Sequence, residues 1–361
     1  DTPSRFLDEL GIPLVTAAAP VSAVTLPALV AELRRWSTSP SAPPSVRDAA
    51  AVELARLADA RDPRGHPLVA SADPRNWWGV RELSSPPEPT PPPIRLSPSQ
   101  VNSVLTCPRN YFLSRQAGGD GGIAMAATLG SLIHRLVQLA VAEDWGPAEF
   151  SAQLDLVWDR LPFEAAWFSA SERLEVELAL SRFLNWRAVR GGELVAVEAP
   201  FSVDLELDGL PIRLSGQVDW LERANGGLLV ADFKTSRTQP TVEQVAGMDQ
   251  LGLYQLAIAA GGFAAIAPEL TPVGASAVYL RQAGRPEDTP KEFWQPSLGT
   301  RPHLTDDPGE CAYETWAHQR LVAAARIVAD GRFPATPGAQ CARCPFAGSC
   351  PASDRGRQVV G

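Results

Sequence analysis

Three consecutive strand-like segments constrain the fold of this chain more than any other feature of its sequence. Residues 194–207 (LVAVEAPFSVDLEL), 210–223 (LPIRLSGQVDWLER) and 227–234 (GLLVADFK) are rich in apolar residues and separated by only a few positions. Asn225-Gly226 lies between the last two, and this dipeptide readily adopts the positive φ angles of a tight turn. The middle of the chain is therefore predicted to form a sheet that contains a β-hairpin.

Helical patterns surround these strands. Apolar positions at helical spacing occur before them within residues 97–115, 126–145 and 150–190, and after them within residues 242–260 and 314–333. Ser97 or Ser99 is a suitable cap for the first of these helices. Residues 274–280 (GASAVYL) add a fourth predicted strand. The second part of the chain is thus predicted to mix helices with a sheet.

A proline-rich segment divides the chain. Residues 1–83 carry two helical patterns, TLPALVAELRRW and VRDAAAVELARLADA, whereas SSPPEPTPPPIRLSPS contains a dense proline cluster that cannot form a regular helix. We therefore expect a helical segment over residues 1–83, a linker over residues 84–96 and a second domain over residues 97–361. The first residue is not Met, so we expect the chain to be cut from a longer protein or processed at its N-terminus.

Composition and charge limit the function classes. The chain has 361 residues and a net charge of −9, which argues against a domain that holds DNA by bulk positive charge. No apolar run approaches ~18 residues, and the start of the chain lacks a signal-peptide pattern. We therefore expect a cytoplasmic protein without membrane contact, in which disulfides are an unfavourable default for the five cysteines.

One apolar strand ends in an acid and a lysine. Only two of the 32 lysine and arginine residues are lysines, and one of them, Lys234, stands two positions after Asp232. Side chains alternate along a strand, so both point to the same face, and the hairpin brings Asp219 of the neighbouring strand towards them. An acid and a lysine at a strand end most often simply face solvent. The second carboxylate favours a site with a chemical role.

Two adjacent carboxylates repel each other, and a divalent cation such as Mg²⁺ or Mn²⁺ relieves that repulsion. Such a cation activates a bound water and stabilises charge on a phosphate, while a lysine orients or deprotonates the water. His134 could supply a nitrogen ligand, although a locally bonded helix histidine is the simpler reading. Gln250 and Tyr254 share one helix face, which also fits ordinary packing.

Taken together and in order, these residues resemble the PD-(D/E)XK nuclease superfamily, specifically its RecB-like branch. The motifs G-x-x-x-H, G-x-x-D, (D/E)-x-K and Q-x-x-x-Y correspond to Gly130/His134, Gly216/Asp219, Asp232/Lys234 and Gln250/Tyr254. The resemblance implies an α/β core, with a mixed central sheet flanked by helices. It also implies metal ligation by His134, Asp219, Asp232 and the Phe233 carbonyl, a catalytic Lys234, and support from Gln250 and Tyr254. Glu198 is either an additional acid or a solvated side chain.

Three cysteines form a second constellation. Cys341, Cys344 and Cys350 are spaced C-x2-C-x5-C, a spacing typical of metal ligands in a reduced compartment, and Cys107 is the best candidate for a fourth ligand. Cys311 lies in a helical pattern and is expected to be a small buried residue. Spacing alone does not separate a zinc site from a [4Fe–4S] cluster. One early and three late cysteines resemble the iron–sulfur staple of AddB-type nucleases, which implies the cluster.

The N-terminal part resembles other proteins less specifically. PSRFLDELG is similar to a segment that follows the motor core of UvrD/RecB-type helicases, and the join from residue 66 to residue 108 resembles the mycobacterial AdnAB helicase–nucleases. No G-x-x-x-x-G-K-[ST] motif occurs, so this chain alone is not an ATP-driven motor. The resemblance implies the nuclease module of an ATP-dependent helicase–nuclease that processes double-strand-break ends, with single-stranded DNA and a second subunit as partners. The alternative is a non-catalytic iron–sulfur scaffold that guides DNA or binds a partner subunit.

Overall fold

A computed structural model describes residues 25–77, 92–119, 125–268, 270–302 and 313–353 of the chain. The chain divides into two units, one formed by Asp1–Pro86 with Ala347–Gly361 and the other by Pro87–Phe346. The PSRFLDELG segment, most of the expected linker and Cys311 lie outside the described residues.

The first unit is helical. Its two helices, α2 (Leu26–Thr38) and α3 (Pro44–Asp59), match the two helical patterns of the sequence, and the short 3₁₀ turns η1 (Ala70–Ala72) and η2 (Pro74–Asn76) follow them. The Thr25 hydroxyl caps α2 by accepting a hydrogen bond from the Ala28 N–H. A small apolar core holds the elements together; it consists of Val30, Leu54, Leu57, Val69 and Ala72. A third 3₁₀ turn of this unit is η6 (Ala347–Ser349).

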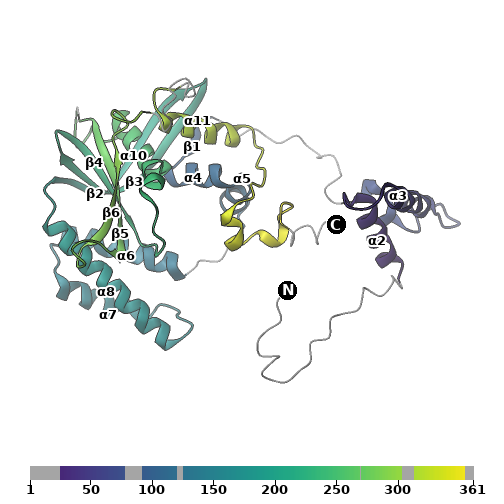
Figure 1. Ribbon diagram of the computed structural model, residues 1–361, viewed down its shortest axis with the longest axis horizontal. Coiled ribbons are helices and arrows are strands. Elements are labelled where there is room, and N and C mark those ends of the chain that lie inside the picture. Colours follow the sequence, from purple (N-terminus) through teal and green to yellow (C-terminus); the bar gives the residue numbers. More distant parts are fainter. Residues whose placement is uncertain (1–24, 78–91, 120–124, 269, 303–312, 354–361) are drawn as a thin grey trace. The chain divides into compact units, whose positions relative to one another are not determined.

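The second unit is built around a six-stranded mixed sheet, shown in Figure 1. Its strands are β1 (Ile94–Leu96), β2 (Glu193–Leu207), β3 (Leu210–Ala224), β4 (Gly227–Lys234), β5 (Pro272–Ala283) and β6 (Pro290–Pro296). β3 pairs with antiparallel β2 along one edge, and with antiparallel β4 and parallel β1 along the other. β4 pairs with parallel β5, and β5 with antiparallel β6. The expected mixed α/β fold is therefore confirmed.

Two tight turns connect the first three long strands. Asn225 and Gly226 have φ angles of 50° and 79°, and Ala224 pairs directly with Gly227, so the predicted two-residue hairpin is confirmed. Asp208 and Gly209 have φ angles of 54° and 70° and join β2 to β3 in the same way. Both turns need residues that tolerate the left-handed region, which Asn, Asp and Gly do best.

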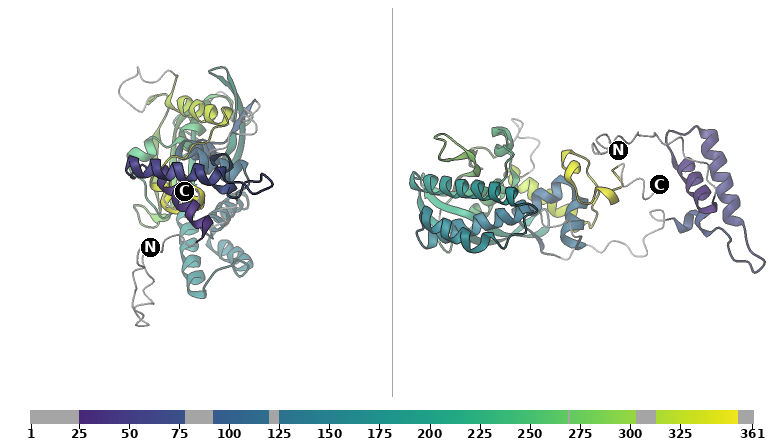
Figure 2. Two further views of the ribbon diagram at one scale, coloured as in Figure 1. Left: turned by 90° about the vertical axis from the view of Figure 1, so that its right-hand side faces the viewer. Right: turned by 90° about the horizontal axis from the view of Figure 1, so that it is seen from below.

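Helices cover both faces of the sheet (Figures 1 and 2). One face packs against α4 (Pro98–Thr106), α10 (Asp249–Ala259) and α11 (Trp316–Ala329). The other packs against α6 (Met125–Ala142), α7 (Pro147–Trp158) and α8 (Ala166–Ala188). Short helical pieces complete the unit: α5 (Pro108–Tyr111), η3 (Phe112–Gln116), α9 (Val242–Ala246) and η5 (Ala339–Arg343). Along β4, Val230 joins the first core and Phe233 the second, as strand alternation requires.

The structure differs from the sequence expectations at several boundaries. Residues 94–96, assigned to the linker, form β1 on the edge of β3. The helix expected over residues 97–115 is capped by Ser97 but breaks at Cys107, because Pro108 cannot continue it. The helix expected over residues 242–260 is two helices, since α9 ends at Gly247. The sequence pattern did not predict strand β6.

By length and composition alone, α6 qualifies as a helix that could cross a membrane, contrary to the expectation that no segment of the chain does. Its apolar side chains are used in the fold instead: Leu129, Ile133 and Val137 are almost completely buried in the core between the sheet and α8. The core of a folded domain accounts for this hydrophobicity without a bilayer.

Candidate active site

The two central carboxylates lie side by side at the end of the β3–β4 hairpin. Trp220 pairs with Ala231, and Asp219 and Asp232 come next on the two strands. Asp219 is 9% and Asp232 2% exposed, which is rare for charged groups unless something compensates them. Burial, together with the negative charge of Asp232, raises the pKa of Asp219. The Phe233 N–H donates to Asp219 Oδ2 at 2.6 Å and fixes that carboxylate.

His134 reaches the same carboxylate from α6. Its Nδ1 lies 3.2 Å from Asp219 Oδ1 and 3.7 Å from Glu198 Oε1. Burial alone would lower the pKa of His134, but the two carboxylates outweigh it and raise the pKa to about 10. Gly130, one turn earlier, allows this approach, because a Cβ there would lie only 3.0 Å from Thr235 Oγ1. The G-x-x-x-H spacing therefore has a steric reason.

Glu198 on β2 belongs to this cluster. Its backbone has a φ angle of 51°, in the left-handed region that a glutamate rarely adopts, and Gln217 Nε2 donates to its carbonyl at 2.7 Å. Among the residues that the structure describes, one group of potential metal-ligand atoms lies within 4.8 Å of one another, and it consists of His134, Glu198 and Asp219. A strained backbone at a polar cluster is a frequent mark of a functional site.

Lys234 is held against Asp232 on the α10 side of β4. Its Nζ lies 2.7 Å from Asp232 Oδ2. The contact is an ion pair without hydrogen-bond geometry, so this buried oxygen accepts no hydrogen bond. Burial alone would lower the pKa of Lys234, but the Asp232 carboxylate outweighs it and raises the pKa. Lys234 is therefore an ammonium ion at neutral pH.

Gln250 on α10 connects the acid to the lysine, and Tyr254 on the same helix contacts the acid. Lys234 Nζ donates to Gln250 Oε1 at 2.6 Å, and Gln250 Nε2 donates to Asp232 Oδ1 at 2.9 Å. Gln250 Nε2 also donates to the Tyr254 hydroxyl at 2.8 Å, and that hydroxyl lies 3.4 Å from Asp232 Oδ1. The Q-x-x-x-Y spacing puts both side chains on one helix face towards the strand end.

The donor set fits a divalent cation. It comprises carboxylate oxygens of Asp219 and Glu198 and a ring nitrogen of His134. The expected ligand Asp232 lies outside this group, and its Oδ2, which accepts no hydrogen bond, is paired with Lys234. Mg²⁺ and Mn²⁺ prefer such oxygen-rich sites, and an imidazole is an accepted additional ligand. Excess negative charge in a buried place also favours a cation. Ligation by the Phe233 carbonyl remains a prediction.

The family comparison agrees with this geometry. The model of the PD-(D/E)XK nuclease superfamily matches residues 95–351. The chain belongs to this superfamily. Its members are typically nucleases that cleave phosphodiester bonds. The match identifies the superfamily, and the RecB-like and AdnAB-type assignments remain predictions.

Two further comparisons add little to the superfamily assignment. The crystal structure of SSO0001 is similar at 14% identity with a TM-score of 0.36, over 73% of this chain and 89% of that chain. No curated protein matches the sequence at a significant level.

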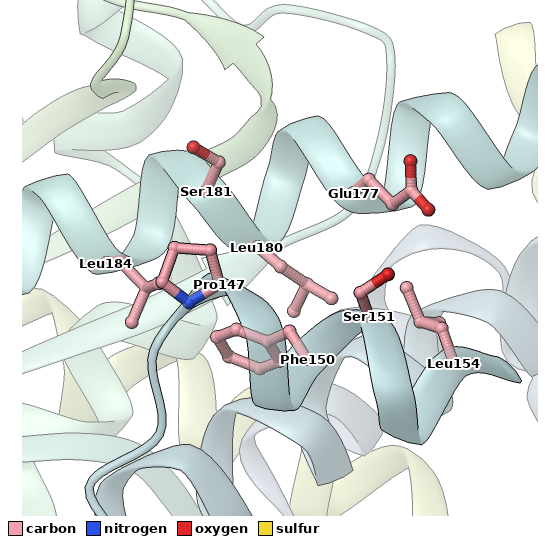
Figure 3. A pocket seen from close by; sticks show the side chains of 8 residues that line it. All are labelled: Pro147, Phe150, Ser151, Leu154, Glu177, Leu180, Ser181 and Leu184. Carbon is pink, nitrogen blue, oxygen red and sulfur yellow. The ribbon is translucent and has the colours of Figure 1, made fainter. Parts of the chain in front are cut away.

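An open cavity of about 540 Å³ gives access to the candidate active site of this PD-(D/E)XK domain. It is lined by Gly130, His134, Glu198, Gln217 and Thr235, together with further residues of α6. A smaller cavity of about 120 Å³ lies between α7 and α8 (Figure 3). Its lining is mainly apolar, with Phe150 and Leu180 facing each other across the two helices and Glu177 at its rim. Of the two cavities, the larger is the one that His134 and Glu198 of the acidic cluster line.

Sequence reasoning missed one side chain beside the lysine. Tyr279 on β5 pairs with Lys234 in register. Partial burial raises the pKa of Tyr279, against the opposing effect of the Lys234 charge. No motif marked this residue, because its position depends on the parallel pairing of β4 with β5. That pairing joins segments separated by α9 and α10.

The segment that carries Cys107 contacts the segment that carries Cys341 and Cys344 within the second unit, although the three thiols do not all lie within 4.8 Å of one another. Gln340 Nε2 donates to the Thr106 carbonyl at 3.3 Å, and the Arg109 N–H donates to the Pro334 carbonyl at 3.1 Å. Asn110 Nδ2 lies 3.4 Å from Cys344 Sγ. The segment that carries Cys341 and Cys344 therefore packs beside the residues around Cys107, whereas Cys350 belongs to the stretch assigned to the first unit.

Proposed function

We propose that this chain is a metal-dependent DNA nuclease. His134, Asp219 and Asp232 would hold Mg²⁺ or Mn²⁺, and Glu198 would join them as a further acid. The observation that carries the proposal is the convergence of these groups with Lys234: His134 Nδ1 lies 3.2 Å from Asp219, and Lys234 Nζ lies 2.7 Å from Asp232. Superfamily membership supports it.

The reaction proposed is hydrolysis of a phosphodiester bond. When bound, the cation lowers the pKa of a water ligand and stabilises negative charge on the phosphate. Lys234 orients the attacking water and neutralises the phosphate charge, while Gln250 fixes the amine through its Oε1. Tyr254 and Gln250 hold the Asp232 carboxylate in place. Lysine suits this role because its compact charge approaches closely, whereas a guanidinium is bulkier and spreads its charge over a plane.

The biological setting proposed is the processing of DNA double-strand-break ends in the cytoplasm. The RecB-like order of the four motifs supports it. The substrate would be single-stranded DNA delivered by a helicase motor, and a second helicase–nuclease subunit would be the protein partner. The sequence has no P-loop motif, so the motor would be supplied by another polypeptide segment or subunit.

A [4Fe–4S] cluster is part of the proposal. Cys107, Cys341, Cys344 and Cys350 would be its thiolate ligands, with a structural role: the cluster would tie the segment before the nuclease core to the segment after it. The contacts of Gln340 with Thr106 and of Cys344 with Asn110 support the pairing of the two segments. Four thiolates also suit zinc, so the metal must be identified directly.

Cleavage of end-labelled single-stranded DNA tests the catalytic proposal. Wild-type protein should cut with Mg²⁺ or Mn²⁺ and not with chelator. Asp232→Asn should abolish cutting, whereas Asp204→Asn, which removes an exposed carboxylate of β2 paired with Arg213, should leave it unchanged. Equal cutting by wild type and Asp232→Asn would refute the proposal, as would equal cutting with and without divalent cation.

A further inference from the structure

A second cavity adjoins the one that His134 and Glu198 line. It has a volume of about 520 Å³ and lies between the start of α6, α8 and the residues that follow β4. Ala126, Ala127 and Thr235 line both cavities. His134 and Glu198 also line the first cavity, so the two spaces meet beside the proposed metal site. A ligand longer than one phosphate group would therefore continue from the first cavity into the second.

The second cavity is basic in an otherwise acidic chain. Its charged lining residues are three arginines, Arg237, Arg281 and Arg343, and one acid, Glu172. Glu172 is 4% exposed, and Arg281 Nη2 bonds to its Oε2 at 2.7 Å while Arg237 bonds to its other oxygen. Three cations against one carboxylate leave an excess of two positive charges, although the whole chain carries −9.

This excess is not explained by the fold alone. A single guanidinium is enough to neutralise a buried carboxylate, and Arg281, whose side chain is 5% exposed, already does so for Glu172. Arg281 Nε is buried without a hydrogen-bond partner, so a buried donor remains available at the cavity. The Arg237 side chain is 59% exposed. It can therefore turn to a ligand while Glu172 keeps its buried partner.

We propose that this cavity binds backbone phosphates of the DNA strand on one side of the bond that is cut, with Arg237 and Arg343 as the phosphate-contacting residues. The inference rests on the proposed nuclease function and assigns the direction in which the strand leaves the reacting centre. Guanidinium groups bind phosphate oxygens through paired donors, and a positive groove that tracks the backbone is the usual way to hold a single strand without reading its bases.

Arg343 links this surface to the cysteine motif. It stands between Cys341 and Cys344, within η5 (Ala339–Arg343). A segment that is anchored against Thr106 through Gln340 thus also supplies a cation to the DNA cavity. A change in the conformation of the cysteine segment would therefore move Arg343 and alter the affinity for DNA.

The test is binding of a fluorescent oligothymidylate in chelator, where no cleavage occurs, measured by anisotropy at several salt concentrations. Arg237→Gln and Arg343→Gln should each weaken binding about fivefold at 0.1 M salt and reduce the slope of log affinity against log salt by about 0.7, as expected for one lost phosphate contact on a single strand. Arg223→Gln is the matched control, because Arg223 is also an exposed arginine paired with one glutamate, Glu193. It should bind as wild type does.

Affinity and salt slope equal to the control in both variants would overturn the inference. If the wild-type protein cuts but the variants bind like the control, the cavity assignment fails and the nuclease proposal stands. If Arg237→Gln weakens binding but wild type never cuts, the cavity assignment stands and the nuclease proposal fails.

Discussion

Gln250 donates its Nε2–H to Asp232 Oδ1 at 2.9 Å, from a helix that begins 15 residues after β4 ends. The same side chain accepts from Lys234 Nζ at 2.6 Å. One amide thus orients both the acid and the amine of the (D/E)-x-K motif, and it needs both of its polar atoms to do so. An amide suits this place because it carries one acceptor and one donor group without adding charge.

Replacing Gln250 should therefore reduce cleavage through positioning. We expect Gln250→Leu to lower the turnover number by about 10–100-fold, because Lys234 and Asp232 each lose a hydrogen bond. Tyr254→Phe should cost less, since its hydroxyl lies 3.4 Å from Asp232 and the Gln250 bridge stays intact. Single-turnover cleavage rates at saturating DNA give the comparison. A larger effect in Tyr254→Phe would contradict this order.

Lys234 should not be replaceable by arginine. Lys234→Met should lower cleavage by about 10²–10³-fold, as for loss of one positioned donor that stabilises developing negative charge. Lys234→Arg should cleave almost as slowly as Lys234→Met, because the guanidinium keeps the charge but not the compact amine.

The same two substitutions should show how much the positive charge of Lys234 contributes to the free energy of unfolding. Without divalent cation, Lys234→Met leaves the buried Asp232 carboxylate unpaired and should lower the free energy of unfolding by about 1–3 kcal/mol, whereas Lys234→Arg should lower it less. Denaturant titrations with chelator and with Mn²⁺ check this. Full activity of Lys234→Arg would show that charge alone suffices.

Metal binding should release protons. In the metal-free protein the pKa of His134 is raised to about 10, so its ring is protonated at neutral pH and must lose that proton to become a ligand. Affinity for Mn²⁺ should thus fall as pH is lowered from 8 to 6, by up to about tenfold per pH unit for one released proton. The raised pKa of Asp219 acts in the same direction. Calorimetry in buffers of different ionisation enthalpy counts the protons; an affinity independent of pH would exclude this linkage.

Glu198 should contribute to cation affinity. Glu198→Gln removes one negative charge from the group that it forms with His134 and Asp219, and we expect Mn²⁺ binding to weaken by at least about tenfold. Glu206→Gln changes an exposed glutamate of the same strand and serves as the control. Titration of both variants with Mn²⁺ makes the comparison. Equal Mn²⁺ affinities of the two variants would show that Glu198 is not a metal ligand.

The proposed [4Fe–4S] cluster should be detectable by visible absorption and by its iron. Protein purified without air should show a broad visible absorption band and contain iron, and Cys107→Ser or Cys344→Ser should lose both. Cys311→Ser should keep them, because the sequence assigns Cys311 to no cluster. Metal analysis that finds zinc and no iron in such preparations would replace the cluster with a structural zinc site.

Much of the site could be anticipated because its motifs are local. Asp232 and Lys234 share a strand face, Gln250 and Tyr254 share a helix face, and Asn225-Gly226 fixes the hairpin that puts Asp219 beside Asp232. Each relation follows from the period of a strand or helix, or from the φ angles of a turn. The break of the helix at Gly247 and the short strand β1 were missed, because a few residues carry too weak a pattern to outweigh their neighbours.

The sequence by itself determined the superfamily motifs, the hairpin and the identity of the acid–lysine pair. Only the tertiary structure decided that Glu198 joins the cluster, that Tyr279 lies against Lys234, and that Arg237 and Arg343 line one cavity. The reason is that these contacts depend on the pairing of β4 with β5 and on how α6, α8 and the cysteine segment pack. Such contacts join residues with no regular spacing in the chain, so no periodicity can report them.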